Sequence, residues 1–201
     1  MESSISPLSQ FKNKDAESWE KAISVFEKIT EQSQFAEIAG CEHISVYFRI
    51  RAIKKLDKHV YQDLLTHIAV NIGGDFARLI WPEMRFIAAQ LVENEQIRQS
   101  VFTNIAQRSD TDLRFKAAEL LTNQEVRQSV YANIVKTHSG FYRALAIYYL
   151  DANLYQSLLE EIAETDDDKL VRKAVMKKLN ANENQDGKRS AAGIARKKKK
   201  L

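Results

Sequence analysis

The sequence has little glycine and proline, with six Gly and two Pro in 201 residues. A β-sandwich or β-barrel needs turn residues about every ten positions, and these two residue types supply many of them. Long helices joined by short connections need far fewer. The shortage therefore favours an all-helical protein, and an apolar content of 44% is enough for one sizeable core.

Cysteine is almost absent, since Cys41 is the only one. A single cysteine excludes an intramolecular disulfide and a zinc site built from cysteines. The four histidines lie in different segments, at spacings that bring no two onto one helix face. The chain also shows no phosphate-binding loop and no Gly-flanked nucleophilic serine. We therefore expect a protein that is not an enzyme and uses no cofactor or metal ion.

Long hydrophobic runs are absent as well. No apolar stretch approaches the roughly 20 residues that cross a bilayer, and the first residues do not have the basic start and apolar stretch of a signal peptide. We expect a soluble, cytoplasmic protein with no membrane span, or a nuclear one in a eukaryotic host.

Positive charge is concentrated at the C-terminal end. Residues 181–201 carry seven basic and two acidic side chains, so this tail has a net charge of +5 within a chain of +3, and the remaining residues total −2. The tail is polar, lacks helical periodicity and is predicted to be disordered. It ends in a basic run of Arg196, Lys197, Lys198, Lys199 and Lys200.

Two functions remain open for this tail. It could bind nucleic acid or an anionic membrane surface through charge alone, or act as a nuclear address. The alternative is a solubilising end with no dedicated partner.

The main positive feature is an internal repeat. Residues 85–105, "RFIAAQLVENEQIRQSVFTNI", and residues 114–134, "RFKAAELLTNQEVRQSVYANI", share 12 of 21 positions without a gap. Weaker copies extend the pattern to "VYQDLLTHIA" from Val60, "RALAIYYLDAN" from Arg143, "LYQSLLEEIA" from Leu154 and "RKAVMKKLNAN" from Arg172. A period of 29 residues predicts stacked supersecondary units, because repeats of this length cannot bury their apolar faces alone.

Each repeat is predicted to be a helical hairpin. Val126, Val130 and Ile134 recur every four residues in "VRQSVYANI", and Leu113, Ala117 and Leu121 do so in "LRFKAAELL", which is the spacing of an amphipathic helix. Asn94 and Asn123 stand where helix N-caps belong, and Asp110 and Asp166–Asp168 mark the partner helices in the same way.

The stretches "DTDLRFKAAELL" (110–121) and "DDDKLVRKAVMKKL" (166–179) resemble HEAT-like repeats, whose second helix commonly opens with Asp, then an apolar-Arg pair, then a small residue and Leu. The resemblance is good over 85–179, fair over 43–76, and absent from the first 40 residues and the tail. It implies that first helices line the convex side of a curved superhelix and second helices the concave side. The segment "HSGFYRALAIYYL" departs from the pattern, because Ser139 and Gly140 replace the Asp.

An arginine recurs once in each second helix, at Arg85, Arg114, Arg143 and Arg172, with a more diverged copy at Arg49. Such a row could track the phosphates of a nucleic acid. Helical geometry also places each Arg beside the apolar stripe, where its head could bond a neighbouring repeat. Both interpretations remain open, and the mild negative charge outside the tail favours the structural one.

The positions one and five residues after each Arg are predicted to face away from the core. They are Phe86, Gln90, Phe115, Glu119, Ala144, Tyr148, Lys173 and Lys177. Aromatic anchors in a concave groove would suit a helix or extended peptide of a partner protein. Alternatively, curvature or neighbouring helices bury the aromatic side chains.

The sequence therefore predicts an all-α, right-handed superhelix, or solenoid, of four to five HEAT-like hairpins over 15–180. A flexible N-terminus (1–14) would precede it, and "DAESWEKAISVFEKI" would form an N-terminal cap helix with Trp19, Ala22 and Phe26 on one face. We expect a protein-binding adaptor or scaffold that uses the concave face. The alternative is a nucleic-acid-associated protein that uses the tail and the Arg row.

Overall fold

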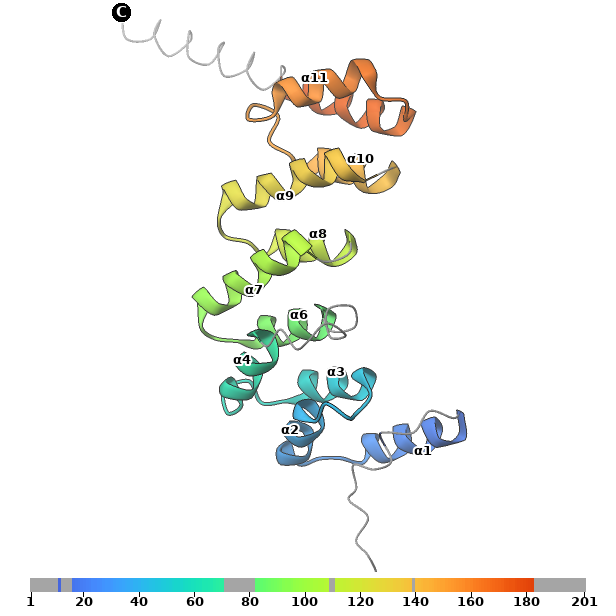
Figure 1. Ribbon diagram of the computed structural model, residues 1–201, viewed down its shortest axis with the longest axis vertical. Coiled ribbons are helices and arrows are strands. Elements are labelled where there is room, and N and C mark those ends of the chain that lie inside the picture. Colours follow the sequence, from blue (N-terminus) through green and yellow to red (C-terminus); the bar gives the residue numbers. More distant parts are fainter. Residues whose placement is uncertain (1–10, 12–15, 71–81, 109–110, 139, 183–201) are drawn as a thin grey trace, which may run out of the picture. The chain divides into compact units, whose positions relative to one another are not determined.

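The computed structural model describes residues 11, 16–70, 82–108, 111–138 and 140–182 (Figure 1). In these residues the regular secondary structure is helical and contains no strand, which confirms the all-α prediction. The chain divides into two compact units, Met1–Ser109 and Asp110–Leu201, here called unit 1 and unit 2 and described separately. Predictions for 1–14 and 181–201 lie outside the described residues, except at Phe11 and at 181–182, which are helical.

Unit 1 is built from consecutive packed helices. They are α1 (Ala16–Glu27), α2 (Gln32–Gly40), α3 (Val46–Lys55), α4 (Gln62–Val70), α6 (Pro82–Leu91) and α7 (Glu95–Arg108). α2 packs on α3, and α6 packs on α3, α4 and α7. α6 begins at Pro82, where the fixed φ of proline and its missing N–H suit the first helical turn.

The N-terminal end of unit 1 is closed by a cluster of aromatic rings. In α1, Ala22 and Phe26 are buried, and Trp19 stacks on Phe48 of α3 with ring centroids 5.2 Å apart. Phe11 is also buried, and the centroid of its ring lies 4.9 Å from that of Phe48 and 6.3 Å from that of Phe26. α1 therefore covers the apolar face of α3, as a cap helix would.

Unit 2 repeats the same kind of packing. It contains α8 (Thr111–Glu119), α9 (Gln124–Thr137), α10 (Gly140–Tyr149), α11 (Gln156–Thr165) and a helix over 169–182. α9 packs on both α8 and α10. Most of the predicted apolar stripes lie in the core: Val130, Ile134, Leu113, Ala117 and Leu121 are buried, while Val126 is half-buried.

The helix starts follow the sequence signals. The side-chain oxygens of Asn94 and Asn123 each accept a hydrogen bond from the backbone N–H three residues later, at 3.1 Å. Asp168 accepts from the N–H of Leu170 at 2.8 Å, at the start of the helix 169–182. At α10 the missing Asp is replaced by Gly140 with φ of 54°, a conformation that favours glycine.

One glutamine closes each of three hairpins. Gln62 of α4 donates from Nε2 to the carbonyl of Leu91 at 3.0 Å, and its Oε1 accepts from the N–H of Glu93 at 2.8 Å. Gln32 makes the same pair of bonds to Lys55 and Asp57, and Gln128 makes them to Tyr149 and Asp151. In each case a side chain of the first helix satisfies backbone groups that the end of the second helix leaves without helical partners.

Candidate functional site

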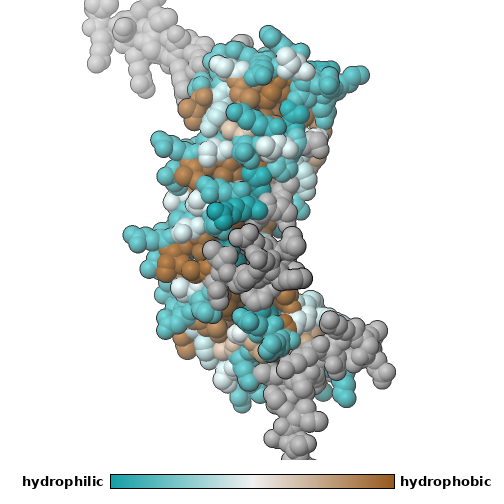
Figure 2. Space-filling view, viewed as in Figure 1, coloured by the Kyte–Doolittle hydropathy of each residue, from teal (hydrophilic) through white to brown (hydrophobic). Residues whose placement is uncertain are grey.

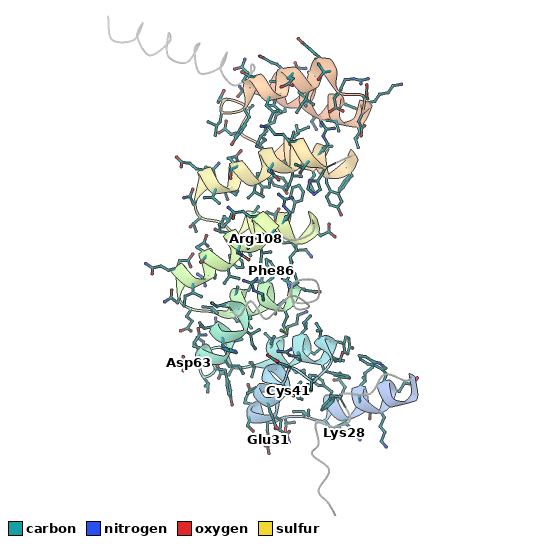
Figure 3. The ribbon with its side chains drawn as sticks, in the orientation of Figure 1. Lys28, Glu31, Cys41, Asp63, Phe86 and Arg108 are labelled. Atoms are coloured by element: carbon teal, nitrogen blue, oxygen red, sulfur yellow. The ribbon has the colours of Figure 1, made fainter. Side chains whose placement is uncertain are left out.

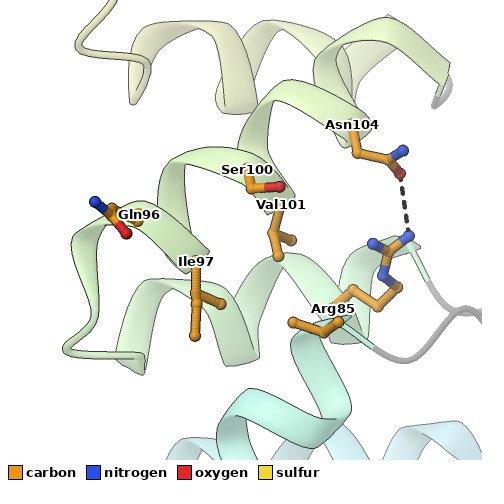
Figure 4. Close-up of a pocket in the computed structure, with 7 residues that line it drawn as sticks. Arg85, Gln96, Ile97, Ser100, Val101 and Asn104 are labelled. Carbon is orange, nitrogen blue, oxygen red and sulfur yellow. Dashed lines mark hydrogen bonds between the residues drawn. The ribbon is translucent and has the colours of Figure 1, made fainter.

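The repeated arginines make contacts inside the units. Arg85 donates from Nε to the carbonyl of Ala69, the next-to-last residue of α4, at 2.9 Å, and from Nη1 to Asn104 Oδ1 of α7 at 3.3 Å (Figure 4). Arg49 makes the corresponding bond to the carbonyl of Ala39 at 3.0 Å. Each guanidinium thus bonds a carbonyl at the end of the preceding first helix.

In unit 2 the arginines also reach the neighbouring hairpin. Arg114 donates to Asn133 Oδ1 of α9 at 2.7 Å. Arg143 pairs with the Asp166 carboxylate, and Arg172 donates to the Asp166 carbonyl. Burial lowers the pKa of Arg49, Arg85 and Arg114 below its ordinary value. This geometry favours the structural interpretation of the Arg row over phosphate binding.

Arg85 also lines an open pocket of unit 1, of about 390 Å³. The other lining residues are Val70, Gln96, Ile97, Ser100, Val101 and Asn104. Figure 4 shows that Ile97, Val101 and Ser100 reach it from α7, while the Arg85 head turns toward Asn104. Of its polar lining residues, Arg85 and Asn104 bond each other at 3.3 Å, so the Arg85 head is engaged within unit 1.

Two predicted surface residues are buried. Phe86 is 7% exposed and packs 5.6 Å from Phe102 of α7, among the helices of unit 1 (Figure 3). Phe115 is 6% exposed, with Tyr142 and Tyr149 of α10 against it. The prediction that these two rings face solvent is wrong, and the alternative is confirmed, because rings of neighbouring helices cover them.

Of the remaining predicted positions, Ala144 is half-buried and the other five are on the surface. Gln90, Glu119, Lys173 and Lys177 are exposed, and so is Tyr148. Ten large apolar side chains are exposed in the described part of the chain, and Figure 2 shows the hydrophobic surface on the side in view as separate patches. Five of them belong to two helices of unit 2: Phe141, Tyr148, Tyr149, Leu170 and Met176. This concentration singles out α10 and the helix 169–182.

The exposed rings of α10 lie on the side of the helix away from the core. Phe141 and Tyr148 are 65% and 68% exposed. They are seven residues apart, which is two helical turns, so they share one face. Tyr149 is partly exposed beside Tyr148, with ring centroids 5.3 Å apart. We call Phe141, Tyr142, Tyr148 and Tyr149 the α10 aromatic surface.

Two tyrosines of this surface pack on buried rings of neighbouring helices. Tyr149 stacks on the buried Tyr131 of α9 at 5.3 Å, and Tyr142 stacks on Phe115 of α8 at 6.2 Å. Phe141 meets Tyr142 edge to face at 5.7 Å. Aromatic pairs at these separations are favourable, so the exposed rings are held by contacts reaching three helices.

Two carboxylates of α8 hold the tyrosine hydroxyls. Tyr142 donates to Asp112 Oδ1 at 2.6 Å. A hydrogen bond to Glu119 raises the pKa of Tyr149, because the neighbouring negative charge disfavours a phenolate. Asp112 and Glu119 are themselves exposed, so negative charge borders the rings on the α8 side.

Other kinds of site find no support in the residues that the structure describes. Among them, no group of three or more His, Cys, Asp or Glu side chains lies close enough to hold a metal ion. Within the same residues, no helix is long and apolar enough to span a membrane. The basic run from Arg196 to Lys200 is outside this part of the chain.

Comparison with known proteins found no protein-family model, curated protein or solved structure that matches the chain. The α10 aromatic surface therefore has to be interpreted from its own chemistry. Phe141 is part of it but was not predicted from the sequence. It lies two residues before Arg143 and seven before Tyr148, so extending the helical wheel by one turn toward the N-terminus would have included it.

Proposed function

We propose that the protein is a non-enzymatic, cytoplasmic scaffold of the HEAT-like type, a right-handed solenoid of four to five hairpins capped by α1. We propose further that it binds a partner protein through the α10 aromatic surface. This binding site takes the place of the one that the sequence suggested at Phe86 and Phe115, which are buried.

The solenoid part of the proposal rests on the recurrence of one hairpin design. The Gln contact to the end of the second helix occurs in α2–α3, α4–α6 and α9–α10. The Arg contact to a carbonyl at the end of the first helix occurs at Ala39, Ala69 and Asp166. Hairpins built alike expose equivalent apolar faces, and stacking is the way such faces are buried.

The exposure of Phe141 and Tyr148 carries the binding part of the proposal. Two large rings that the core does not use lie on one face of one helix, 65% and 68% exposed. Contiguous exposed apolar surface often marks an interaction site, and aromatic side chains are enriched among residues that dominate binding energy. Phe141 and Tyr148 each meet a neighbouring tyrosine edge to face, and those tyrosines stack on buried rings. Side chains restrained in this way lose less conformational entropy on binding, which favours affinity.

The nucleic-acid alternative receives less support. The Arg row is engaged in contacts inside the units, at Ala39, Ala69, Asn104, Asn133 and Asp166. The alternative therefore depends mainly on the C-terminal basic run, and to a lesser extent on the exposed lysines of the helix 169–182. Binding of that kind would be independent of α10 and would fall steeply with salt.

Affinity capture with the double variant Phe141→Ser/Tyr148→Ser tests the proposal. We expect this variant to keep the melting temperature within a few degrees but to lose the proteins that the wild-type chain retains after nuclease treatment. Val60→Ser is the control, because Val60 is 69% exposed but lies in unit 1. Equal retention by both variants would contradict binding through α10.

A further inference from the structure

We propose that the α10 aromatic surface takes an extended peptide segment that presents a basic residue, a large apolar residue and an acidic residue in that order. This inference rests on the proposed protein-binding function and specifies the chemistry of the partner. It follows from three parallel rows of side chains on α8, α10 and the helix 169–182.

The middle row is apolar. Phe141 and Tyr148, two residues before and five after Arg143, face outward and are exposed. Between them on the same side lies Leu145, which is half-buried and adds apolar surface between the two rings. This row provides a binding position for one large apolar or aromatic side chain.

The row on α8 is acidic. Asp112 and Glu119 occupy the places two before and five after Arg114, the same helical positions as Phe141 and Tyr148. Tyr142 bonds Asp112 at 2.6 Å and Tyr149 bonds Glu119, so each carboxylate lies directly beside the α10 rings. Both are exposed and can meet a basic side chain next to an apolar anchor.

The row on the helix 169–182 is apolar and basic. Leu170 and Lys177 occupy the same two positions relative to Arg172, and Lys173 is exposed between them. Lys178 donates to the Tyr148 carbonyl at 2.7 Å and lies 5.9 Å from the centre of its ring, which joins this helix to α10. The helix carries five basic residues and no acidic one. An acidic side chain of a partner would therefore be attracted on this side.

The corresponding positions in unit 1 do not repeat this order. Around Arg49 they are Tyr47 and Lys54, and around Arg85 they are Glu83 and Gln90. Tyr47 is tied to Trp19 and Arg51 through ring contacts of 5.5 Å and 5.4 Å. The acidic, aromatic and basic rows on neighbouring helices are thus a feature of unit 2 within the described residues.

Helix spacing sets the expected spacing in the partner. Packed helices lie about 8–10 Å apart, and an extended chain advances about 3.3 Å per residue. The basic and acidic residues should therefore each stand about three residues from the apolar anchor. The segment can cross the three helices in either chain direction. The basic residue can therefore lie on the N-terminal or the C-terminal side of the apolar anchor, with the acidic residue on the other side.

The charge order also separates a peptide from a nucleic acid. A nucleic-acid strand stacked on Phe141 and Tyr148 would bring phosphates next to Asp112 and Glu119, where like charges repel. A peptide segment with a basic and an acidic end is attracted by the carboxylates of α8 at one end and by the lysines of the helix 169–182 at the other.

The test is selection of a random 12-residue peptide display library on the immobilised full chain. The library is first depleted on the Phe141→Ser/Tyr148→Ser variant, so that retained peptides depend on the aromatic pair. We expect a consensus with basic, apolar and acidic residues at about three-residue intervals. The selected peptide is then synthesised and its dissociation constant is measured by calorimetry.

A charge swap makes this second measurement specific. Glu119→Lys should weaken the selected peptide about tenfold, since an attractive exposed pair becomes a repulsive one. A peptide with its basic residue changed to Glu should regain most of that loss on Glu119→Lys. Lys177→Glu should behave in the same way toward the acidic end. Glu164→Lys is the control, because it makes the same charge change at an exposed position of α11.

The outcomes separate the two proposals. If no peptide depends on Phe141 and Tyr148, binding through α10 is wrong and the charge order fails with it. If peptides depend on the rings but lack either charge, or show no rescue in the charge swap, the charge order alone is wrong. Binding of an oligothymidylate probe that is lost in the Phe141→Ser/Tyr148→Ser variant would also overturn the peptide inference.

Discussion

At the scale of single residues, the main finding is the glutamine that closes three of the hairpins, Gln32, Gln62 or Gln128. Gln99 and Gln128 are identical in the doubled segments "IRQSV" and "VRQSV", yet a polar residue in an amphipathic pattern is expected to face water. Gln128 is instead 4% exposed and satisfies two backbone groups. The sequence showed that the position repeats but not that its side chain is buried, because burial depends on where the end of the next helix lies.

We expect Gln128→Ala to lower the free energy of unfolding by about 2 kcal/mol, because it leaves the Tyr149 carbonyl and the Asp151 N–H without their partner. Gln156→Ala is the matched control. Gln156 occupies the equivalent place in α11 but is exposed and bonds Glu160, so its loss should stay within about 0.5 kcal/mol. Chemical denaturation of both variants measures the difference. Equal losses would mean that the backbone contacts do not stabilise the hairpin.

Tyr131 makes stability depend on alkaline pH. Burial, aided by the nearby Glu119 charge, raises the pKa of Tyr131 from 10.0 to about 12. Because the folded-state pKa is the higher one, this contribution is complete below pH 10 and is lost as the pH rises from 10 to about 12. We expect the unfolding free energy of Tyr131→Phe to fall less steeply over this range than that of the wild type. Parallel slopes in a pH series of denaturation curves would contradict the shift.

At the scale of helices, the sequence predicted correctly where helices begin. It did not predict which side chains are covered by neighbouring helices. Asn94 and Asn123 start helices as predicted, and Pro82 begins α6, because caps and first-turn residues act on the backbone next to them. Phe115 was assigned to the surface because a helical wheel represents one helix in isolation. Tyr142 and Tyr149 of the next second helix cover it, and nothing in the α8 sequence indicates their presence.

Each Arg of the row contacts a neighbouring helix or the end of one. We expect Arg85→Ala to cost about 2 kcal/mol of unfolding free energy, since it removes the bonds to Ala69 and Asn104. Arg108→Ala removes the same charge at an exposed position of α7 and should cost within about 0.5 kcal/mol.

The same pair of variants tests the phosphate interpretation. Retention on immobilised single-stranded DNA at low salt should be equal for Arg85→Ala and Arg108→Ala, because both lose one positive charge. A selective loss for a folded Arg85→Ala would contradict a purely structural role and would restore the nucleic-acid alternative.

At the scale of the whole molecule, repeated residues pack the hairpins, and residues that do not repeat form the candidate binding surface. Residues that recur at the 29-residue period, such as Gln128, Arg114 and Val130, are buried and hold the hairpins together. Phe141 and Tyr148 have no aromatic counterpart at equivalent positions of α6, α8 or 169–182, and they are exposed. The repeat made the helices and their caps predictable. The candidate site departs from the repeat, so the pattern indicated its face but not its members.

The central claim is that the exposed rings of α10 are not required for folding and are therefore kept for a partner. The unfolding free energies of Phe115→Ser, Phe141→Ser and Tyr148→Ser test it most directly. We expect Phe115→Ser to cost about 3–5 kcal/mol, as for other buried rings, and the other two to cost less than about 1 kcal/mol each, as for exposed residues. A loss for Phe141→Ser or Tyr148→Ser as large as that for Phe115→Ser would assign these rings to the core and contradict the claim.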